Sequence, residues 1–253
     1  MALEPSGTMS IGGPTSGRSI NLELSKSATA TSGLGDADLR ALADVPSGAI
    51  SMSDFYGASS TLATGGNVDN LRPGNGYAYH TFTTTGSGTF TVLDTLTAEI
   101  LVVAGGGGGG MVDGGAGGGG AGGVAYCSSL SLSAGTYPLT VGAGDPVSTS
   151  SGGGLGSPSV FYSPAPTTGG RITALGGGQG ALGPRSGGAT GTAGGSGGGG
   201  QGFQAIRPGG SGTQPGQSNP PNTTNYGHGG GHGPTPGGGG GGAGGAGSSG
   251  TGG

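Results

Sequence analysis

Two histidines, His228 and His232, have the spacing in this chain that most resembles a metal site. Side chains four residues apart lie on one face of an α-helix, where two imidazoles can hold a zinc ion. Three glycines separate these histidines, and glycine disfavours a helix interior. In an extended chain with three residues per turn, positions four apart do not align. We therefore expect histidines exposed in a loop, with no metal and no cofactor.

Acidic residues give little support for catalysis. Cleavage of a glycan uses two carboxyl groups held about 5–9 Å apart. After Ala104 the chain offers Asp113 and Asp145 alone, with Asp94 and Glu99 shortly before them. Each is more simply a turn or surface residue. The acidic residues therefore favour a protein that is not an enzyme, and a glycan depolymerase stays an alternative.

Nucleophile and nucleotide motifs are equally weak. The lone cysteine, Cys127, excludes an internal disulfide and a zinc site built on cysteines, and it predicts a small buried residue. The sole lysine, Lys26, lacks the preceding glycine of a phosphate-binding loop. Glycine motifs for dinucleotides arise here from composition alone.

The segment between Gly200 and Gly237 is the richest in side chains suited to recognition. Aromatic rings, arginine and amides are the groups that protein interfaces use. A solvated connector rich in proline and asparagine has the same composition, so both interpretations stay open. The candidate receptor-contacting residues are Phe203, Gln204, Arg207, Asn222, Tyr226, His228 and His232, and Ile206, Gln214, Asn219 and Asn225 share the segment.

Glycine dominates the part of the chain that must position these groups. Of 73 glycines, 59 follow Ala104, and charged residues make up 7% of the chain, with a net charge of −4. Glycine buries no side chain and loses the most backbone freedom on folding, so something other than an apolar core must offset that cost. Disordered chains usually carry high charge, which this region lacks.

The scarcity of Lys and Arg argues against nucleic acid as a partner, and no stretch has the roughly 18 apolar residues of a membrane span.

The physical alternative to disorder is a set of extended glycine helices with three residues per turn, packed side by side. Each would hydrogen-bond its neighbours through the backbone, which only glycine allows at such close approach.

Strands are predicted at 124–132, 137–141, 159–162 and 171–175. Segments 77–83 and 89–92 predict a hairpin around glycines 86–88, and the apolar run 99–104 predicts a strand buried on both faces.

The first 60 residues repeat a phrase, because Pro-Ser-Gly at 5–7 returns at 46–48. Alternating apolar residues follow each copy and predict short strands. Asp36 predicts the start of a helix over 37–43, with Leu39 and Leu42 on one face. Ser53 or Asp54 is expected to cap a helical turn. So small a module usually needs a partner or an oligomer for its stability, which suggests that it attaches to another protein. The attachment candidates are Ile50, Met52, Phe55 and Tyr56.

These phrases resemble a known family. Segments 39–43 and 46–57 are similar to an N-terminal module found on tailed-bacteriophage tail proteins. The remainder resembles the glycine-rich domain of phage tail fibres and adhesins, on phrases that follow in the expected order at 79–82, 99–107, 122–124, 132–137, 141–144 and 172–178.

The resemblance implies a mainly β protein with little helix, divided into an attachment module (1–60), a β region (61–104) and a glycine-rich adhesin-like domain (105–253). Such domains usually close with an apolar strand, which we expect to be missing here. The implied role is a tail fibre or adhesin that binds phage tail or baseplate proteins and a host surface glycan or outer-membrane protein. The habit of phage fibres implies a homo-oligomer, a trimer.

The resemblance places the protein in the virion tail after synthesis in the host cytoplasm. The first 30 residues have neither the basic start nor the apolar stretch of a signal peptide. A structural baseplate or tail-tip component without receptor binding is the alternative among virion proteins, and an aggregating low-complexity protein is a further one.

Overall fold

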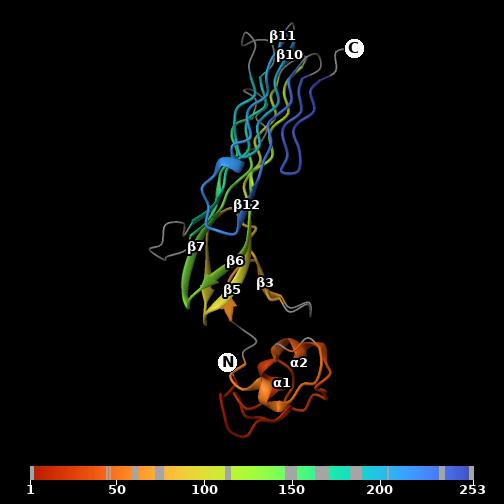
Figure 1. Ribbon diagram of the computed structural model, residues 1–253, viewed down its shortest axis with the longest axis vertical. Helices are drawn as coiled ribbons and strands as arrows, with labels where there is room; N and C mark the ends of the chain where they lie inside the picture. Colours follow the sequence, from red (N-terminus) through yellow and green to blue (C-terminus); the bar gives the residue numbers. More distant parts are fainter. Residues whose placement is uncertain are drawn as a thin grey trace. The chain divides into compact units, whose positions relative to one another are not determined.

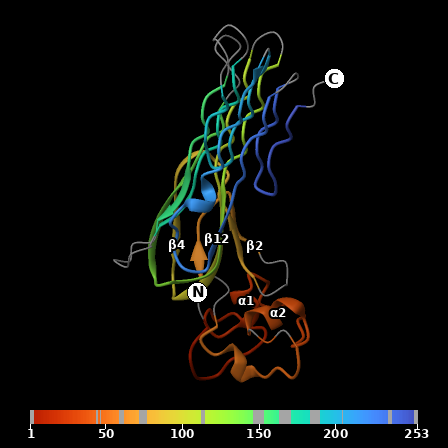
Figure 2. The same cartoon turned by 45° about the horizontal axis from the view of Figure 1, so that its top comes forward.

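The computed structural model describes residues 3–43, 45, 47–58, 62–71, 77–111, 115–145, 153–162, 171–182, 190–203, 205–233 and 237–250 (Figures 1 and 2). The fold is mainly β with few, short helices, as predicted. The chain divides into two compact units. Unit 1 comprises Met1–Phe82, Thr91–Thr95 and Ser133–Gly135, and unit 2 comprises Thr83–Phe90, Leu96–Leu132 and Thr136–Gly253. The predicted division at residues 60 and 104 stays a prediction.

Unit 1 contains a small helical core. Its helices are α1 (Ile20–Glu23), α2 (Ala37–Leu42) and the 3₁₀ helix η1 (Met52–Phe55). Asp36 precedes α2, and the buried leucines lie on one face, which confirms the predicted helix, but the Asp36 side chain makes no capping hydrogen bond to it. The buried core consists of Leu3, Ile20, Leu39, Leu42 and Phe55.

The repeated Pro-Ser-Gly phrase does not lead into two strands, so that expectation is wrong. In the first copy, Ser10 makes an isolated bridge with Ser19. In the second copy the chain winds into η1, because the Asp54 carboxylate accepts a hydrogen bond from the Ser51 backbone N–H at 2.7 Å. The helical turn predicted there is present, and Ser51 is its N-cap, rather than Ser53 or Asp54.

Unit 1 also contains a two-stranded ribbon. Strands β2 (Val68–Leu71) and β3 (Tyr79–Thr81) pair antiparallel, and β1 (Ala63–Thr64) pairs with the end of β4 (Gly86–Val92). The predicted hairpin between 77–83 and 89–92 is therefore wrong. The glycines at 86 and 88 belong to β4, so they do not form a turn that would return the chain onto β3.

Unit 2 begins with two packed antiparallel sheets. One has the order β4–β7–β8–β9, and the other has the order β12–β6–β5. Strands β5 and β6 contact β8 and β9 across the interface. The strands predicted from apolar stretches are confirmed, with the bounds β5 (Leu96–Val103), β6 (Val124–Leu132), β7 (Gly135–Val141), β8 (Ser159–Tyr162) and β9 (Arg171–Ala174). Strand β12 (Thr223–Tyr226) lies in a stretch where we expected no strand.

Apolar side chains fill the space between the two sheets. The buried residues of these strands include Val102, Ala125 and the cross-strand pair Phe161 and Ile172, together with Cys127, which is a free, buried cysteine as predicted. Strand β5 was expected to be buried on both faces, and this is wrong, since its exposure alternates along the strand. A second sheet covers one face of β5, as is usual for antiparallel sheets.

The glycine-rich segments beyond the sheets form a bundle held by backbone hydrogen bonds. Gly117 and Gly120 donate to the segment 178–181, at 3.0 and 2.8 Å, whereas Gly118 donates to another segment, at Gly238 (2.9 Å). Residues three apart thus face the same neighbour, which is the repeat of a threefold extended helix. Figures 1 and 2 show these segments running side by side from the sheets.

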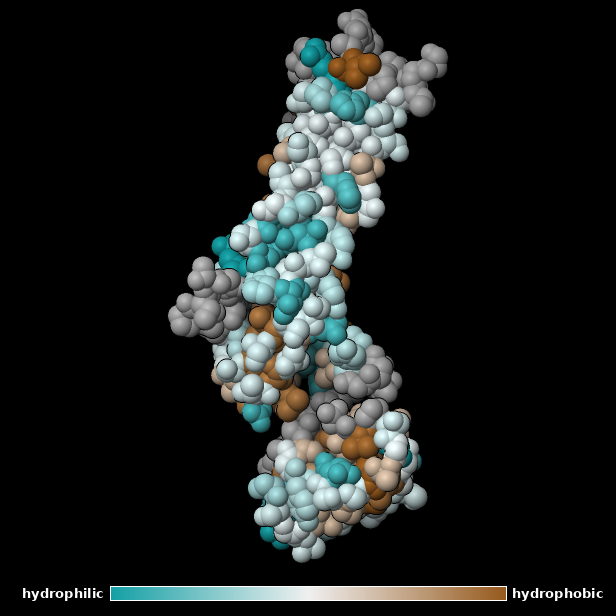
Figure 3. Space-filling view, viewed as in Figure 1, coloured by the Kyte–Doolittle hydropathy of each residue, from teal (hydrophilic) through white to brown (hydrophobic). Residues whose placement is uncertain are grey.

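The segment 196–200 lies at the centre of this bundle. All five residues are buried. The backbone of this segment is hydrogen-bonded to six other stretches of chain, at 118–121, 178–181, 192, 210, 228–231 and 238–241. The surface of the bundle is nearly white in Figure 3, as the near-zero hydropathy of glycine dictates, and brown atoms gather instead over the strands and unit 1.

Close approach explains why the bundle needs glycine. A Cβ built on Gly107 would lie under 3.0 Å from the carbonyl oxygens of Gly177 and Gly178, and one on Gly199 would lie that close to the oxygens of Gly238 and Gly239. Real Cβ atoms essentially never come so near to a backbone atom. Backbone atoms therefore occupy the places that side chains fill in an ordinary core.

Candidate functional site

A short hairpin carries the first group of candidate residues. Strands β10 (Gly202–Phe203) and β11 (Ala205–Ile206) pair antiparallel, and Ile206 is 69% exposed. The Gly202 N–H donates to the Gly115 carbonyl at 2.7 Å, which ties the hairpin to the glycine bundle. Gln204 and the side chain of Phe203 lie outside the described residues.

Arg207 follows the hairpin and links it to His232. The Arg207 backbone forms an isolated antiparallel bridge with Gly233, the residue after His232. The histidine side chain is exposed, while its backbone N–H donates to Ser249 Oγ at 3.2 Å. The buried Arg207 Nε has no hydrogen-bond partner among the described residues. Ile206, Arg207 and His232 therefore share one end of the bundle, which we call the tip group.

Asn222 and Tyr226 lie in a different place. Asn222 has a φ of 64° and precedes β12, and its carbonyl accepts from the Ser128 N–H at 3.0 Å. Tyr226 is an exposed residue of β12 and lies opposite Val124 of β6. Both belong to the three-stranded sheet, so the predicted residues form two separate groups instead of one site.

His228 lies on a glycine segment between the two groups. Its side chain is exposed, and its carbonyl accepts from the Gly197 N–H at 2.9 Å. With about 3.1 Å of rise per residue, four steps along such a segment place His232 roughly 12 Å further along. The two imidazoles are therefore separated along the bundle. Over the described ranges, the structure contains no group of three or more His, Cys, Asp or Glu side chains suited to a metal.

The sequence interpretation missed an amide network that fixes the loop before β12. Gln214 is fully buried, and its Oε1 accepts from the Leu175 N–H at 2.7 Å while its Nε2 donates to the Thr173 carbonyl at 3.0 Å. Asn219 binds both the N–H and the carbonyl of Thr173, at 2.8 and 3.1 Å, and its Nδ2 donates to Asn225 Oδ1 at 2.7 Å. These amides give edge strand β9 the partners that another strand would supply. Their signal in the sequence is the interruption of glycine by Gln and Asn.

The attachment candidates of unit 1 are mostly part of its core. Phe55 is fully buried, and Ile50 and Met52 are partly buried against the core. Tyr56 is 40% exposed, and its hydroxyl donates to the Gly7 carbonyl at 2.7 Å. Of the four candidates, Tyr56 is therefore the residue that presents the most surface.

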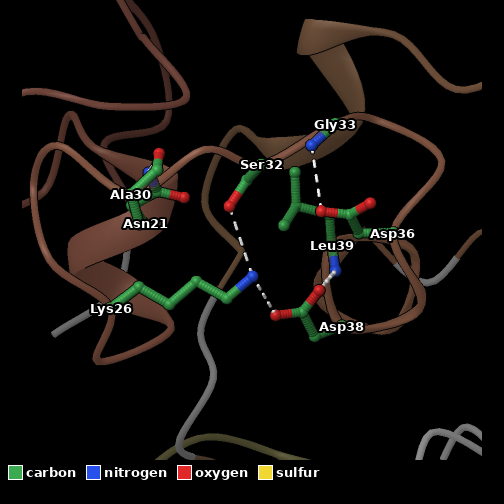
Figure 4. A network of polar contacts seen from close by, with 8 residues as sticks. All are labelled: Asn21, Lys26, Ala30, Ser32, Gly33, Asp36, Asp38 and Leu39. Carbon is green, nitrogen blue, oxygen red and sulfur yellow. Dashed lines mark hydrogen bonds and ion pairs between the residues drawn. The ribbon is translucent and has the colours of Figure 1, made fainter.

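A polar network connects α1 to α2 within unit 1 (Figure 4). Lys26, just after α1, lies 2.5 Å from the Asp38 carboxylate and donates to Ser32 Oγ at 3.2 Å. The Gly33 N–H donates to the Asp36 carboxylate at 2.9 Å. Because the lysine and the aspartate are partly exposed, this ion pair orients the loop more than it stabilises it.

Comparison with known families identifies a glycine-rich domain. A glycine-rich domain family matches residues 83–253, which are 171 of the 253 residues (253 − 82). The chain belongs to this glycine-rich domain family. Neither a curated protein nor a solved structure matches the chain. No helix among the described residues has the length and apolar character needed to cross a membrane.

Proposed function

We propose that this glycine-rich protein is a non-enzymatic tail fibre or adhesin of a bacteriophage virion. Unit 1 would attach it to tail or baseplate proteins, and unit 2 would present a receptor-contacting surface to a host glycan or outer-membrane protein. The protein would be made in the host cytoplasm and act in the virion tail.

One observation carries the proposal: a bundle stabilised by backbone hydrogen bonds ends in a group of chemically distinct side chains, of which Ile206 and His232 are exposed and Arg207 is partly exposed. Glycine segments are alike along their length, so specificity must reside in the residues that interrupt them. The tip group supplies an apolar side chain, a guanidinium and an imidazole from neighbouring backbone positions at one end of the bundle. Arginine is enriched among the residues that dominate binding interfaces.

The virion assignment is tested by labelling purified phage particles with an antibody against this chain and locating the label by electron microscopy. Label at the tail of intact particles is the expected result. Particles that bind none of the antibody, although their lysate contains the protein, would refute the assignment.

Receptor contact is tested by Arg207→Ala in assembled particles. Loss of an interface anchor weakens a site by about 2 kcal/mol, or roughly thirtyfold, and several copies per particle amplify the loss. We expect slower adsorption with unchanged particle yield. Ser218→Ala, at an exposed position of the loop before β12, is the control. Adsorption at the parental rate would show that Arg207 does not contact the receptor.

A further inference from the structure

The guanidinium of Arg207, in the tip group, has no partner within the described part of the chain. The side chain is partly exposed at the end of the bundle, where Figure 1 labels β10 and β11. Over the described residues it forms neither an ion pair nor a hydrogen bond, and its Nε atom is buried without an acceptor. Buried polar groups in folded proteins are nearly always hydrogen-bonded, so an exception calls for an explanation.

The backbone around Arg207 explains why the chain supplies no acceptor. The residue opposite it in the antiparallel bridge is Gly233, whose N–H donates to the Arg207 carbonyl at 2.9 Å. A Cβ built on Gly200 would lie under 3.0 Å from the same carbonyl. Glycine segments therefore approach this residue closely, and glycine has no side chain that could accept a hydrogen bond from the guanidinium.

Carboxylates that could neutralise Arg207 are scarce in unit 2. The 108 residues after Asp145 (253 − 145) contain three arginines and neither Asp nor Glu. The Asp145 carboxylate accepts from the Gly154 N–H, and the Glu99 carboxylate accepts from the Tyr126 hydroxyl at 2.5 Å. The third acidic residue of the unit, Asp113, lies outside the described residues. Over the described residues, no carboxylate balances the charge of Arg207.

An arginine in these surroundings is suited to a carboxylate or a phosphate group. Its planar fork of N–H donors matches two oxygens of either anion, and such charge-assisted bonds are roughly twice as strong as neutral ones. The chain has a net charge of −4, whereas unit 2 has three basic and three acidic residues and a formal net charge of zero (3 − 3). Binding of an anion to unit 2 would therefore depend on the position of an arginine and not on the net charge.

The apolar surface at the tip favours a glycan over an acidic peptide. The centre of a protein–protein interface is apolar and rich in aromatic side chains. Among the described residues after Leu155, the exposed large apolar side chains are those of Ile206 and Tyr226, and Tyr226 belongs to the sheet. One isoleucine is a small apolar centre for a protein partner, whereas a glycan is recognised mainly through its polar and charged groups.

We propose that Arg207 binds the carboxylate or phosphate group of an anionic glycan. This inference rests on the proposed receptor role of the tip group, and it names the chemical class of the ligand. The guanidinium donates to two oxygens of the anion, and no existing ion pair or hydrogen bond of Arg207 has to be broken.

Biolayer interferometry on the purified full chain tests the inference. The immobilised probes are neutral dextran, carboxymethyl-dextran and phosphorylated dextran, so the sugar is constant and the charged group varies. We expect binding to at least one charged polymer and none to neutral dextran, and the comparison of the two charged polymers distinguishes carboxylate from phosphate. Arg207→Ala should weaken binding about tenfold, because it removes hydrogen bonds to a charged group. Arg207→Lys keeps the charge without the planar fork and should bind with intermediate strength.

Arg171→Ala is the matched control. It removes the same charge from unit 2 at β9, where the Arg171 guanidinium lies 5.2 Å from the centre of the Tyr162 ring. This variant should bind like the parent, and circular dichroism should show that every variant is folded. Equal binding to neutral dextran would overturn the proposal, as would an equal loss for Arg171→Ala and Arg207→Ala. Stronger binding to immobilised poly(glutamic acid) than to either charged dextran would also overturn it, in favour of an acidic peptide.

Adsorption of particles that carry Arg207→Ala separates this inference from the proposed receptor role. Binding to charged dextran that requires Arg207, together with adsorption at the parental rate, would refute the receptor role and support the anion site. Absence of binding to both charged polymers, together with slower adsorption, would overturn the anionic ligand and support the receptor role.

Discussion

Many glycines of the bundle occupy places where neighbouring backbone fills the space beside the Cα atom. Gly199 shows the consequence, because a Cβ there would meet the carbonyl oxygens of Gly238 and Gly239. A side chain in an ordinary core escapes overpacking by changing rotamer, whereas a hydrogen-bonded backbone has no such freedom. Gly244 differs, since a Cβ there would meet nothing within 4 Å. The cost of a single methyl group should therefore depend on position within the same bundle.

The residue-scale prediction compares Gly199→Ala with Gly244→Ala. We expect Gly199→Ala to lower the free energy of unfolding by about 3 kcal/mol, the upper part of the usual range for overpacking. Gly244→Ala should leave it unchanged or raise it by about 0.5 kcal/mol, since alanine restricts the unfolded chain. Denaturant titration gives both values. Equal effects at the two positions would show that the backbone around Gly199 accommodates a methyl group without lowering the free energy of unfolding.

At the scale of elements, the sequence predicted helices and strands that follow from a local pattern, but it did not predict which strands pair. Leu39 and Leu42 identified α2 because their spacing is a property of that helix alone, and the apolar stretches identified β6 to β9. The partner of β3 depends on β2, and pairing between strands is decided by packing outside either segment. The Gln214 network escaped prediction for the same reason, because Thr173 is 41 residues away in the chain.

The candidate site was predictable in composition and not in arrangement. The sequence identified a single stretch rich in recognition groups, without predicting the tip hairpin or β12 within it. It had no means of showing that the intervening loop is tied to β9 by Asn219 and Gln214, so that Tyr226 belongs to a sheet and Arg207 to the tip group. Amides that resembled recognition groups are structural.

The element-scale prediction is that Gln214→Leu loosens the edge of β9. The substitution leaves the part-buried Leu175 N–H without its acceptor, which costs about 1 kcal/mol, the lower end of the range for a buried group. Hydrogen exchange at Leu175 and Thr173 should accelerate, while exchange in β6 to β7 stays slow. Ser218→Ala, in the same loop, is the matched control. If Leu175 stays as protected as in the parent, the amide side chain does not hold this edge.

At the scale of the whole molecule, the two units are stabilised by different means. Residues up to Ala58 bury an ordinary apolar core of leucine, isoleucine and phenylalanine side chains. The Leu3 N–H donates to the Ala58 carbonyl at 2.8 Å, which closes this part of the chain on itself. Unit 2 relies on a two-sheet core and on backbone hydrogen bonds among glycine segments. Each unit therefore has its own source of cooperativity.

The whole-molecule prediction is that deletion of residues 1–58 separates attachment from folding. The deleted residues contain all five core residues of unit 1, and those between the sheets of unit 2 are retained. Calorimetry should lose one transition while the unfolding temperature of the glycine-rich unit stays within about 2 °C, since no core residue of that unit is removed. Hydrogen exchange in 196–200 should remain slow. If residues 1–58 attach the chain to the virion, as proposed, the truncated chain expressed in place of the parent should be absent from purified particles. Tyr56→Ala in the full chain complements the deletion, since it changes the exposed attachment candidate and leaves the Phe55 core in place. Truncated protein recovered in particles at the parental level would show that attachment resides in unit 2, and a collapse of the glycine-rich unit on deletion would show that the two units fold as one.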